Sequence, residues 1–323
     1  MNKLDAITFG EAMALFMADE VGNLHEIHHF TKALAGAEVN VAVGLSRLGL
    51  NVAWMSKVGN DAFGKYIQEY LKKEQVHTTQ VLKDEENPTG FQLKAKMLSG
   101  DPEVQYFRKN TAASKLSQVD LNEEFISQAK HLHMTGIPLA VSKSFRHYAL
   151  GALAIAKQHK IPVSFDTNLR PKLWKSPEEM ISVINDAAFQ CNIILPGIHE
   201  GRVLTGFKHA SEIADFYLNH SENVELVIVK LGPDGAYYKS RNEEDYVSGF
   251  AVENVVDTVG AGDGFATGVI SGLIEGLPIR EAIIRGNAIG ALAVQSPGDH
   301  DGYPTRKHLN NYLKNHLEGA SVL

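Results

Sequence analysis

The segment from Val256 to Gly268 places a glycine-rich turn, a carboxylate and a run of small residues in immediate succession. Gly260, Ala261 and Gly262 have almost no side chain, so their backbone N–H groups can converge on an oxyanion at the positive start of a following helix. Asp263, in the first turn of that helix, could accept the proton of a hydroxyl group that attacks a γ-phosphate. The alternative is a tight strand-to-helix turn whose aspartate only offsets the helix dipole. The segment therefore predicts an anion site with a general base, and a purely structural turn stays open.

A second polar cluster follows the buried run from Ile161 to Phe165. Asp166, Asn168 and Arg170 alternate there, and their side chains project to the same side if the extended geometry continues. A carboxylate, an amide and a guanidinium that face one way can bind a polyhydroxylated anion. A solvated loop before a proline would also explain the pattern.

Three further segments carry basic or amide groups. Tyr106 and Arg108 lie in a segment of alternating hydrophobicity, where Arg108 could meet a carboxylate with a bidentate fork or could belong to an ordinary charged strand edge. The segment from Lys230 to Gly235 predicts a hairpin turn, which explains most of its glycines. The segment from Arg285 to Ala293 is rich in small residues, which suits close helix packing or a flat purine.

Three other patterns match known motifs only in part. The segment 25–29 has the letters of a zinc-protease motif but no helical stripe to bring its histidines to one metal. The segment 59–65 matches a phosphate-binding P-loop until Tyr66 replaces the residue that would hold magnesium. Phe265 stands where a dinucleotide fingerprint has its third glycine, so a dehydrogenase is disfavoured.

The elements that must position these residues alternate along the chain. Apolar runs at 131–135, 161–165, 193–195 and 226–229 are separated by helical stretches, which is typical of βαβ units with a parallel sheet. A small-residue helix is predicted from Ala37 to Leu48. The segment 89–107 alternates like strands with one exposed face and predicts an antiparallel flap. The fold class is a doubly wound α/β fold, in which ligands sit outside the carboxyl ends of the strands.

Composition excludes several classes of protein. The chain has 323 residues, 44% of them hydrophobic, and a net charge of -7 without a basic stripe, which argues against a nucleic-acid surface. A single cysteine excludes an internal disulfide. The sequence has no apolar run of membrane-spanning length and no signal-like start, so we expect a cytoplasmic protein without membrane contact.

Three motifs in order resemble those of the ribokinase-like (phosphofructokinase B) sugar kinases: 36–42, 58–64 and 257–263. The resemblance spans nearly the whole chain. It implies one domain over residues 1–323, with a mostly parallel sheet flanked by helices and a small β-sheet lid made by about residues 12–34 and 88–110. It also implies ATP and Mg²⁺ as cofactors, a sugar or sugar acid as substrate, and a homodimer or higher homo-oligomer through the lid.

Within that family, the segments 106–109, 166–170 and 298–302 are similar to those of 2-keto-3-deoxygluconate kinases. The resemblance implies phosphorylation of a primary hydroxyl of that sugar acid or a close relative. It assigns Asp263 as the base, Gly260 to Gly262 as the anion hole, and Lys230, Gly232 and Asn287 to the ATP site. The substrate side is Gly36, Asn40, Tyr106, Arg108, Asn168 and Arg170.

Two departures from the family pattern concern the metal and the sugar pocket. Many members have Asn-x-x-Glu near the magnesium, whereas this chain keeps Glu200 and has Gly197 in place of the asparagine. Gln92 stands in the flap where an aromatic residue is expected. The resemblance also allows a monovalent cation near Asp257 and Thr258. A kinase for 5-dehydro-2-deoxygluconate, fructose or a nucleoside, and a catalytically silent sensor, are the alternatives.

Overall fold

The computed structural model describes residues 3–97 and 103–317, so residues 98–102 of the predicted lid and both ends of the predicted domain lie outside the described part. The helices are α1 Ala37–Arg47, α2 Ala62–Lys73, α3 Glu123–Ile126, α4 Ile137–Val141, α5 Lys143–Gln158, α6 Pro177–Ala188, α7 Ile198–Thr205, α8 Ala210–His220, α9 Ala261–Ile274, α10 Ile279–Ala293 and α11 Arg306–Leu317. The strands are β1 Ala6–Phe9, β2 Met13–Val21, β3 Phe30–Ala35, β4 Val52–Gly59, β5 Val81–Asp84, β6 Phe91–Lys96, β7 Val104–Phe107, β8 Leu132–Thr135, β9 Val163–Asp166, β10 Ile193–Ile194, β11 Leu226–Lys230, β12 Ala236–Ser240 and β13 Glu244–Val247.

The main sheet has nine strands in the order β13-β12-β11-β10-β9-β8-β1-β4-β5. Its pairs are parallel from β5 to β11, and β12 and β13 add an antiparallel edge. The four apolar runs predicted as strands are β8 to β11, and the glycine-rich segment after Lys230 forms the predicted hairpin turn into β12. The doubly wound α/β prediction is confirmed.

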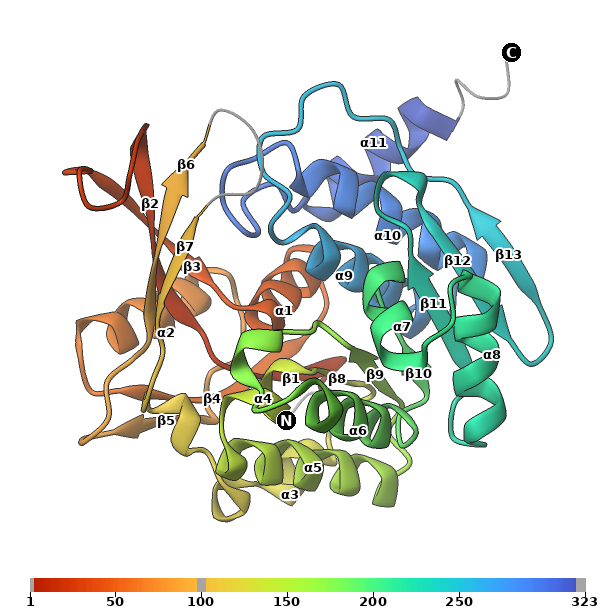
Figure 1. The fold of residues 1–323 in the computed structure, drawn as a ribbon, viewed down its shortest axis with the longest axis horizontal. Coiled ribbons are helices and arrows are strands. Elements are labelled where there is room, and N and C mark those ends of the chain that lie inside the picture. Colours follow the sequence, from red (N-terminus) through yellow and green to blue (C-terminus); the bar gives the residue numbers. More distant parts are fainter. Residues whose placement is uncertain (1–2, 98–102, 318–323) are drawn as a thin grey trace.

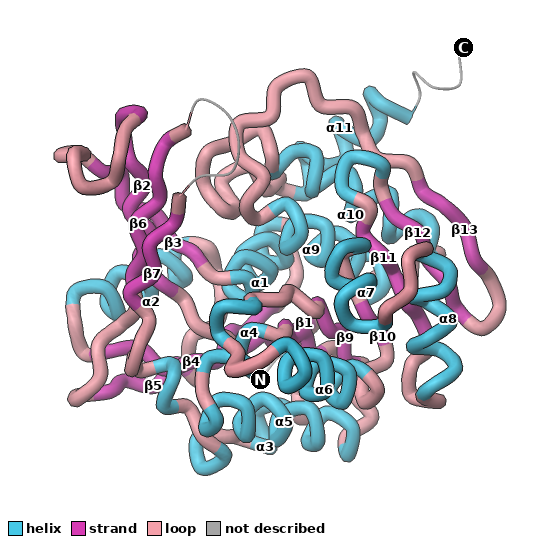
Figure 2. Tube along the Cα trace, in the orientation of Figure 1, coloured by secondary structure: helices cyan, strands magenta, loops and turns pink. Residues whose placement is uncertain are grey.

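Helices cover both faces of this sheet (Figures 1 and 2). Alternate residues of one strand enter different cores: Ile7 and Phe9 of β1 pack with α3, α5, α6 and α8, whereas Ala6 packs with α1, α2 and α9. This follows from the two-residue period of a strand, which sends neighbouring side chains to opposite faces. The carboxyl ends of the parallel strands therefore lie in one row between two fixed layers of helix.

Helices α9 and α10 pack closely through their small residues. A Cβ atom added at Gly268 would lie 2.5 Å from the Cα atom of Gly286, so neither helix can carry a larger side chain there without moving. This contact explains the small-residue pattern after Arg285 as helix packing.

The smaller sheet has the order β3-β2-β6-β7 and stands to one side of the main sheet (Figure 1). The predicted lid segments therefore form a sheet, and the antiparallel flap predicted for the segment 89–107 is confirmed by the pair β6–β7, although the sheet as a whole is mixed. Strands β2 and β6 run parallel, while β2–β3 and β6–β7 are antiparallel. The parallel pair arises because β4, α2 and β5 of the main body separate β2 from β6 in the chain, so the chain re-enters the lid in the original direction.

Across residues 3–97 and 103–317, every helix is too short or too polar to serve as a membrane span.

Candidate active site

A cavity of about 360 Å³ lies between the smaller sheet and the carboxyl ends of the parallel strands. Its wall contains nearly all of the predicted substrate and catalytic residues, which come from both sheets and four helices or helix starts. These residues are Gly36, Asn40, Tyr106, Arg108, Asn168, Arg170, Glu200, Lys230, Gly260, Gly262 and Asp263. Residues up to 227 positions apart in the sequence thus meet in one site, as the sheet topology requires.

The glycine-rich turn has the geometry of a helix start. Gly260 is the N-cap of α9 with φ 83°, a left-handed conformation, and a Cβ atom there would lie 1.7 Å from the carbonyl oxygen of Asp299. Only glycine fits. The N–H group of Ala261 already donates to the Thr258 carbonyl at 3.3 Å. A Cβ atom at Gly262 would have Lys230 Nζ as its nearest neighbour, at 3.7 Å, so the turn opens toward an ammonium group.

Asp263 lies in the first turn of α9 and is buried. Its carboxylate accepts a hydrogen bond from Asn40 Nδ2 at 2.9 Å and a longer one from Asn168 Nδ2 at 3.4 Å. Burial raises the pKa of Asp263 above the ordinary value, and the hydrogen bond from Asn40 opposes that rise. A buried carboxylate whose pKa moves toward neutrality, beside a helix N-terminus, suits a general base.

Asn168 reaches this carboxylate by a route that the sequence did not predict. The extended geometry of β9 ends at Asp166, and Asn168 takes a positive φ of 36°. The three alternating polar residues therefore do not share one extended face, although all three line the cavity. The left-handed turn, which asparagine tolerates better than most residues, aims Asn168 at α9.

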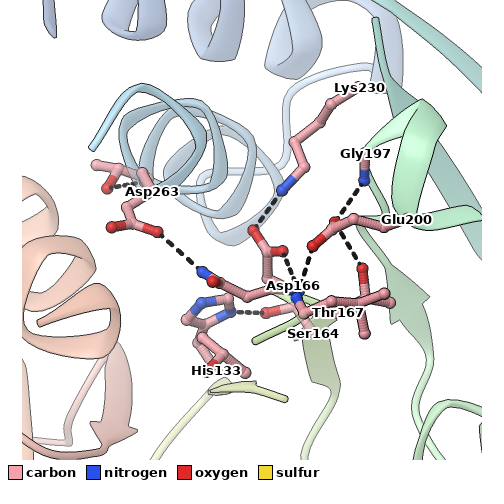
Figure 3. Close-up of polar contacts among 12 residues, drawn as sticks. His133, Ser164, Asp166, Thr167, Gly197, Glu200, Lys230 and Asp263 are labelled. Carbon is pink, nitrogen blue, oxygen red and sulfur yellow. Dashed lines mark hydrogen bonds and ion pairs between the residues drawn. The ribbon is translucent and has the colours of Figure 1, made fainter. Parts of the chain in front are cut away.

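A charged cluster joins β9, α7 and β11 beneath the turn (Figure 3). Lys230 Nζ donates to Asp166 Oδ2 at 2.5 Å; the Asp166 side chain is buried and that of Lys230 is 17% exposed. Burial raises the pKa of Asp166 to about 6, although the Lys230 charge opposes the rise, and the pKa of Lys230 is raised because three carboxylates surround it. Lys230 therefore carries its charge in the wall of this cavity, beside the glycine turn.

Glu200 accepts three hydrogen bonds, from the N–H groups of Gly197 at 2.8 Å and Leu169 at 2.6 Å and from Thr167 Oγ1 at 2.8 Å (Figure 3). Burial would raise the pKa of Glu200, but the Lys230 charge and these three donors together lower it. Because the carboxylate caps α7 through Gly197, it holds the start of that helix. In the described part of the chain, His, Cys, Asp and Glu side chains form no group of three that could hold a metal ion. A magnesium ion here would need phosphate oxygens among its ligands, with Glu200 facing it from the cavity wall.

The wall of the first cavity also contains an ion pair that was not predicted from the sequence. Arg108 donates from Nε and Nη2 to Glu11 Oε2, at 2.8 and 2.6 Å, so its fork meets a carboxylate of the protein. Glu11 comes two positions after β1, at a strand end, which was the available signal. Arg170 is exposed and donates only to its neighbour's carbonyl, at 2.9 Å. Gln92 is buried opposite Tyr106 in the lid register.

A second missed group is Lys94, on the lid strand β6. Its side chain is 5% exposed and makes an ion pair with Asp257 and another, at 3.6 Å, with Asp299. Asp257 in turn accepts the N–H of Val259 at 3.1 Å, within the glycine-rich turn. Lys94 lies two positions after Gln92, so both side chains point to the same face of the strand. This alternation is the sequence feature that could have identified Lys94. The lid is therefore tied electrostatically to the turn.

A second cavity, of about 440 Å³, lies on the other side of the turn. Most of its wall is apolar, from Phe250, Val252, Phe265 and Val294 among others, and the predicted nucleotide residues Lys230, Gly232 and Asn287 all line it, as do Ala261 and Gly262. Asn287 Nδ2 donates to the carbonyls of Val247 and Ser248, at 3.2 and 3.0 Å, so the amide supports the wall. Lys230 and Gly262 belong to both cavities.

Comparison with known proteins identifies the family of this chain. Residues 3–306 match the model of the pfkB family carbohydrate kinases. The chain is 50% identical, over 96% of its own length and 96% of the relative's, to 2-dehydro-3-deoxygluconokinase of Bacillus subtilis (strain 168).

Two solved structures share the architecture. A PfkB protein from Polaromonas sp. JS666 is 45% identical, with a TM-score of 0.88 over 95% of this chain and 99% of that one. A structure described as a ribokinase II from E. coli, in complex with ATP and Mg²⁺, is 27% identical, with a TM-score of 0.90 over 97% and 100%. The match over nearly the whole sequence, with a nine-stranded sheet, a lid and a buried aspartate at the glycine turn, shows that the chain belongs to the pfkB family of carbohydrate kinases.

Proposed function

We propose that this carbohydrate kinase transfers the γ-phosphoryl group of ATP to the primary hydroxyl of 2-keto-3-deoxygluconate or a close sugar acid. One observation carries the proposal: buried Asp263 and the α9 helix start separate a polar cavity from an apolar one, and Lys230 and Gly262 line both. An acceptor hydroxyl in the first cavity and a triphosphate reaching out of the second would meet at this boundary. Asp263 would remove the hydroxyl proton there.

The chain's other residues act by position and charge. The α9 amides and Lys230 would stabilise the negative charge on the oxygens of the γ-phosphoryl group while this group is transferred in line from ATP to the acceptor hydroxyl. Asn40 would orient Asp263, and the lid would exclude water so that ATP is not hydrolysed without a sugar. Mg²⁺, arriving with the triphosphate, would neutralise part of its charge, with Glu200 facing it from the wall.

A sugar acid is favoured over a neutral sugar because two guanidinium groups line the polar cavity. Arg170 has no carboxylate partner within the described residues and is free to meet a substrate carboxylate. Arg108 would use the part of its guanidinium that Glu11 does not engage, with Tyr106 beside it. The name of the Bacillus subtilis relative agrees with this class of substrate. A kinase of the same fold for 5-dehydro-2-deoxygluconate, fructose or a nucleoside is the competing function, and a silent sensor is disfavoured by the intact Asp263 site.

The family resemblance allowed a monovalent cation near Asp257 and Thr258. In this chain the Lys94 ammonium already provides a positive charge to Asp257 and Asp299. We therefore propose that turnover does not depend on added potassium.

We also propose that the whole chain works as one kinase domain and that two copies pair through the lid. The four-stranded sheet has free edges at β3 and β7, and it exposes Tyr106 and Phe107. Free strand edges and exposed aromatic side chains both favour association with a second sheet.

The direct test is ADP release from Mg-ATP with 2-keto-3-deoxygluconate, 5-dehydro-2-deoxygluconate, fructose and ribose presented separately. We expect strong turnover on the first sugar and little ATP hydrolysis without it. Preference for fructose or ribose would remove the sugar-acid proposal and keep the kinase.

A further inference from the structure

The segment 298–302 contains a buried histidine to which the proposed reaction assigns no role. His300 is 1% exposed and lies between α1 and α2; it does not line either cavity, but its neighbour Asp299 lines the first one. Its backbone carbonyl accepts a hydrogen bond from Arg47 Nη1 at 2.7 Å, which fixes the main chain independently of the imidazole. The imidazole itself must therefore be explained by what its two nitrogen atoms contact.

Three hydrogen bonds connect α2 to the catalytic aspartate through this imidazole. Tyr70 Oη lies 2.9 Å from His300 Nε2, and His300 Nδ1 lies 2.9 Å from Asn40 Oδ1. Asn40 Nδ2 then lies 2.9 Å from Asp263 Oδ2. The chain of contacts runs from a half-buried tyrosine to the buried aspartate in the cavity wall.

The direction of every proton in this chain follows from its inner end. An ionised Asp263 only accepts, so Asn40 must present its NH₂ group to it and its carbonyl oxygen to His300. His300 must then carry its proton on Nδ1, and its Nε2 accepts from the Tyr70 hydroxyl. Burial lowers the pKa of His300 to about 4, which keeps the ring neutral and able to accept at Nε2.

We propose that His300 is a positioning residue for phosphoryl transfer: its Nδ1–H locks the Asn40 amide in the orientation that donates to Asp263. The proposal rests on the proposed role of Asp263 as general base. Without the Nδ1 donor, the Asn40 amide can rotate and present its oxygen to the carboxylate, which removes a hydrogen bond and adds repulsion. The ionised base becomes harder to form, and the same amide no longer presents a fixed group to the sugar.

Several charged and titratable groups surround the two ends of this hydrogen-bond chain, and a variant of one residue leaves all the others unchanged. Those facing Asp263 are Arg170, Lys230, Glu38, Asp166, Glu200, Asp299 and Tyr303. Those facing His300 are Arg47, Glu74, Tyr70 and Tyr303. Because none of these is changed in a His300 variant, a shift in the pH profile reports on the hydrogen-bond chain.

The test compares two amide substitutions whose N–H groups lie at different positions, because the Gln side chain is one methylene longer than that of Asn. His300→Asn places its amide at the position of Nδ1 and can still donate to Asn40, whereas His300→Gln places its amide near Nε2 and cannot. We expect the acid limb of kcat/KM for the sugar to move up by about one pH unit in His300→Gln and to stay near the wild-type pH in His300→Asn. The KM for ATP should be the same in both.

Tyr70→Phe removes the outermost donor without touching the core, and should move the limb in the same direction by less. Thermal unfolding of each variant separates loss of fold from loss of positioning. An unmoved limb in His300→Gln, or equal shifts in both His300 variants, would overturn the proposal. If the His300 variants do not fold, an unmoved limb in Tyr70→Phe overturns it.

Asp263→Asn, measured beside them, keeps the two hypotheses apart. Full turnover in Asp263→Asn would refute the base assignment itself, whereas an inactive Asp263→Asn with an unmoved limb in His300→Gln would refute only the role of His300.

Discussion

The phosphate side and the sugar side of the active site are built in different ways. On the phosphate side, the groups are backbone amides of a helix start and a carboxylate in the first turn, fixed by α9 packing against α1 and α10. On the sugar side, the groups are long charged side chains, and several are already paired with protein carboxylates: Arg108 with Glu11 and Lys94 with Asp257.

This difference indicates where the site is rigid and where it adapts. Backbone amides on a packed helix cost no reorganisation when charge develops, which is what catalysis requires. Paired side chains can exchange one carboxylate for another when the substrate arrives, at the cost of breaking an existing contact. Catalytic power should therefore reside on the phosphate side and substrate choice on the lid side.

The largest effect should come from the phosphate side. Asp263→Asn keeps the shape and the contact with Asn40 but removes the base, so kcat should fall by about 10³-fold, within the range for general bases. Steady-state ADP release with saturating sugar measures it. Residual activity within about tenfold of wild type would mean that the hydroxyl loses its proton elsewhere.

On the sugar side, Arg170→Ala should lower kcat/KM for a sugar acid by about 30-fold and leave kcat/KM for a neutral sugar nearly unchanged. The reason is that no protein carboxylate among the described residues loses an ion-pair partner when Arg170 is removed. Parallel assays with 2-keto-3-deoxygluconate and fructose measure this ratio. Equal losses on both sugars would contradict recognition of a carboxylate by Arg170.

Arg108→Ala is a harder test, because it leaves Glu11 buried without its partner. The matched control is the pair Glu11→Gln and Arg108→Ala in one chain. If Arg108 binds the substrate, the double variant should regain stability in thermal unfolding but not its kcat/KM for the sugar acid. Recovery of both would make Arg108 a structural partner of Glu11 alone.

The pH profile separates the two sides again. Burial raises the pKa of Asp263 above 3.8, and only its ionised form can act as the proposed base. Activity should therefore be full above the raised value and decline about tenfold per pH unit below it. Loss of the acid limb in the residual activity of Asp263→Asn assigns the titration to the phosphate side; a limb that persists in that variant would assign it to another group. Because the Arg170 charge lowers the pKa of Asp263, Arg170→Ala should move the limb to higher pH.

The smallest effect concerns the link between the lid and the turn. Wild-type turnover should not respond to potassium chloride when compared with choline chloride at equal ionic strength. Lys94→Met should lose about five- to tenfold in kcat and regain part of it with potassium, because the ion can replace the buried ammonium charge. Potassium stimulation of the wild type would show that Lys94 does not take the cation's place.

The sequence predicted the site best where its residues are contiguous. The turn from Gly260 to Asp263 could be read directly, because glycines before a helix and an acid in its first turn have a local physical meaning. Contacts between residues that lie far apart in the sequence could not be predicted in this way. Arg108 meets Glu11 across 97 positions, Lys94 meets Asp257 across 163, and His300 meets Asn40 across 260.

The same limit explains one pairing that was not predicted and one error of geometry. Alternation predicts a strand but not the direction of its neighbour, so the parallel pairing of β2 and β6 was not available from the segment 89–107 alone. The alternation of Asp166, Asn168 and Arg170 was real, but a single left-handed residue ended the strand. Local pattern gave the residues; the fold decided which side chains face each other.

The shared wall at Lys230 has a thermodynamic consequence. The Lys230 ammonium group borders both cavities and is bound to Asp166, so the binding of one ligand is coupled to the binding of the other. If ATP changes the affinity for the sugar by some factor, the sugar must change the affinity for ATP by the same factor. Equilibrium titration of either ligand, with and without an unreactive analogue of the other, reads out the cooperativity that this one side chain builds into the enzyme.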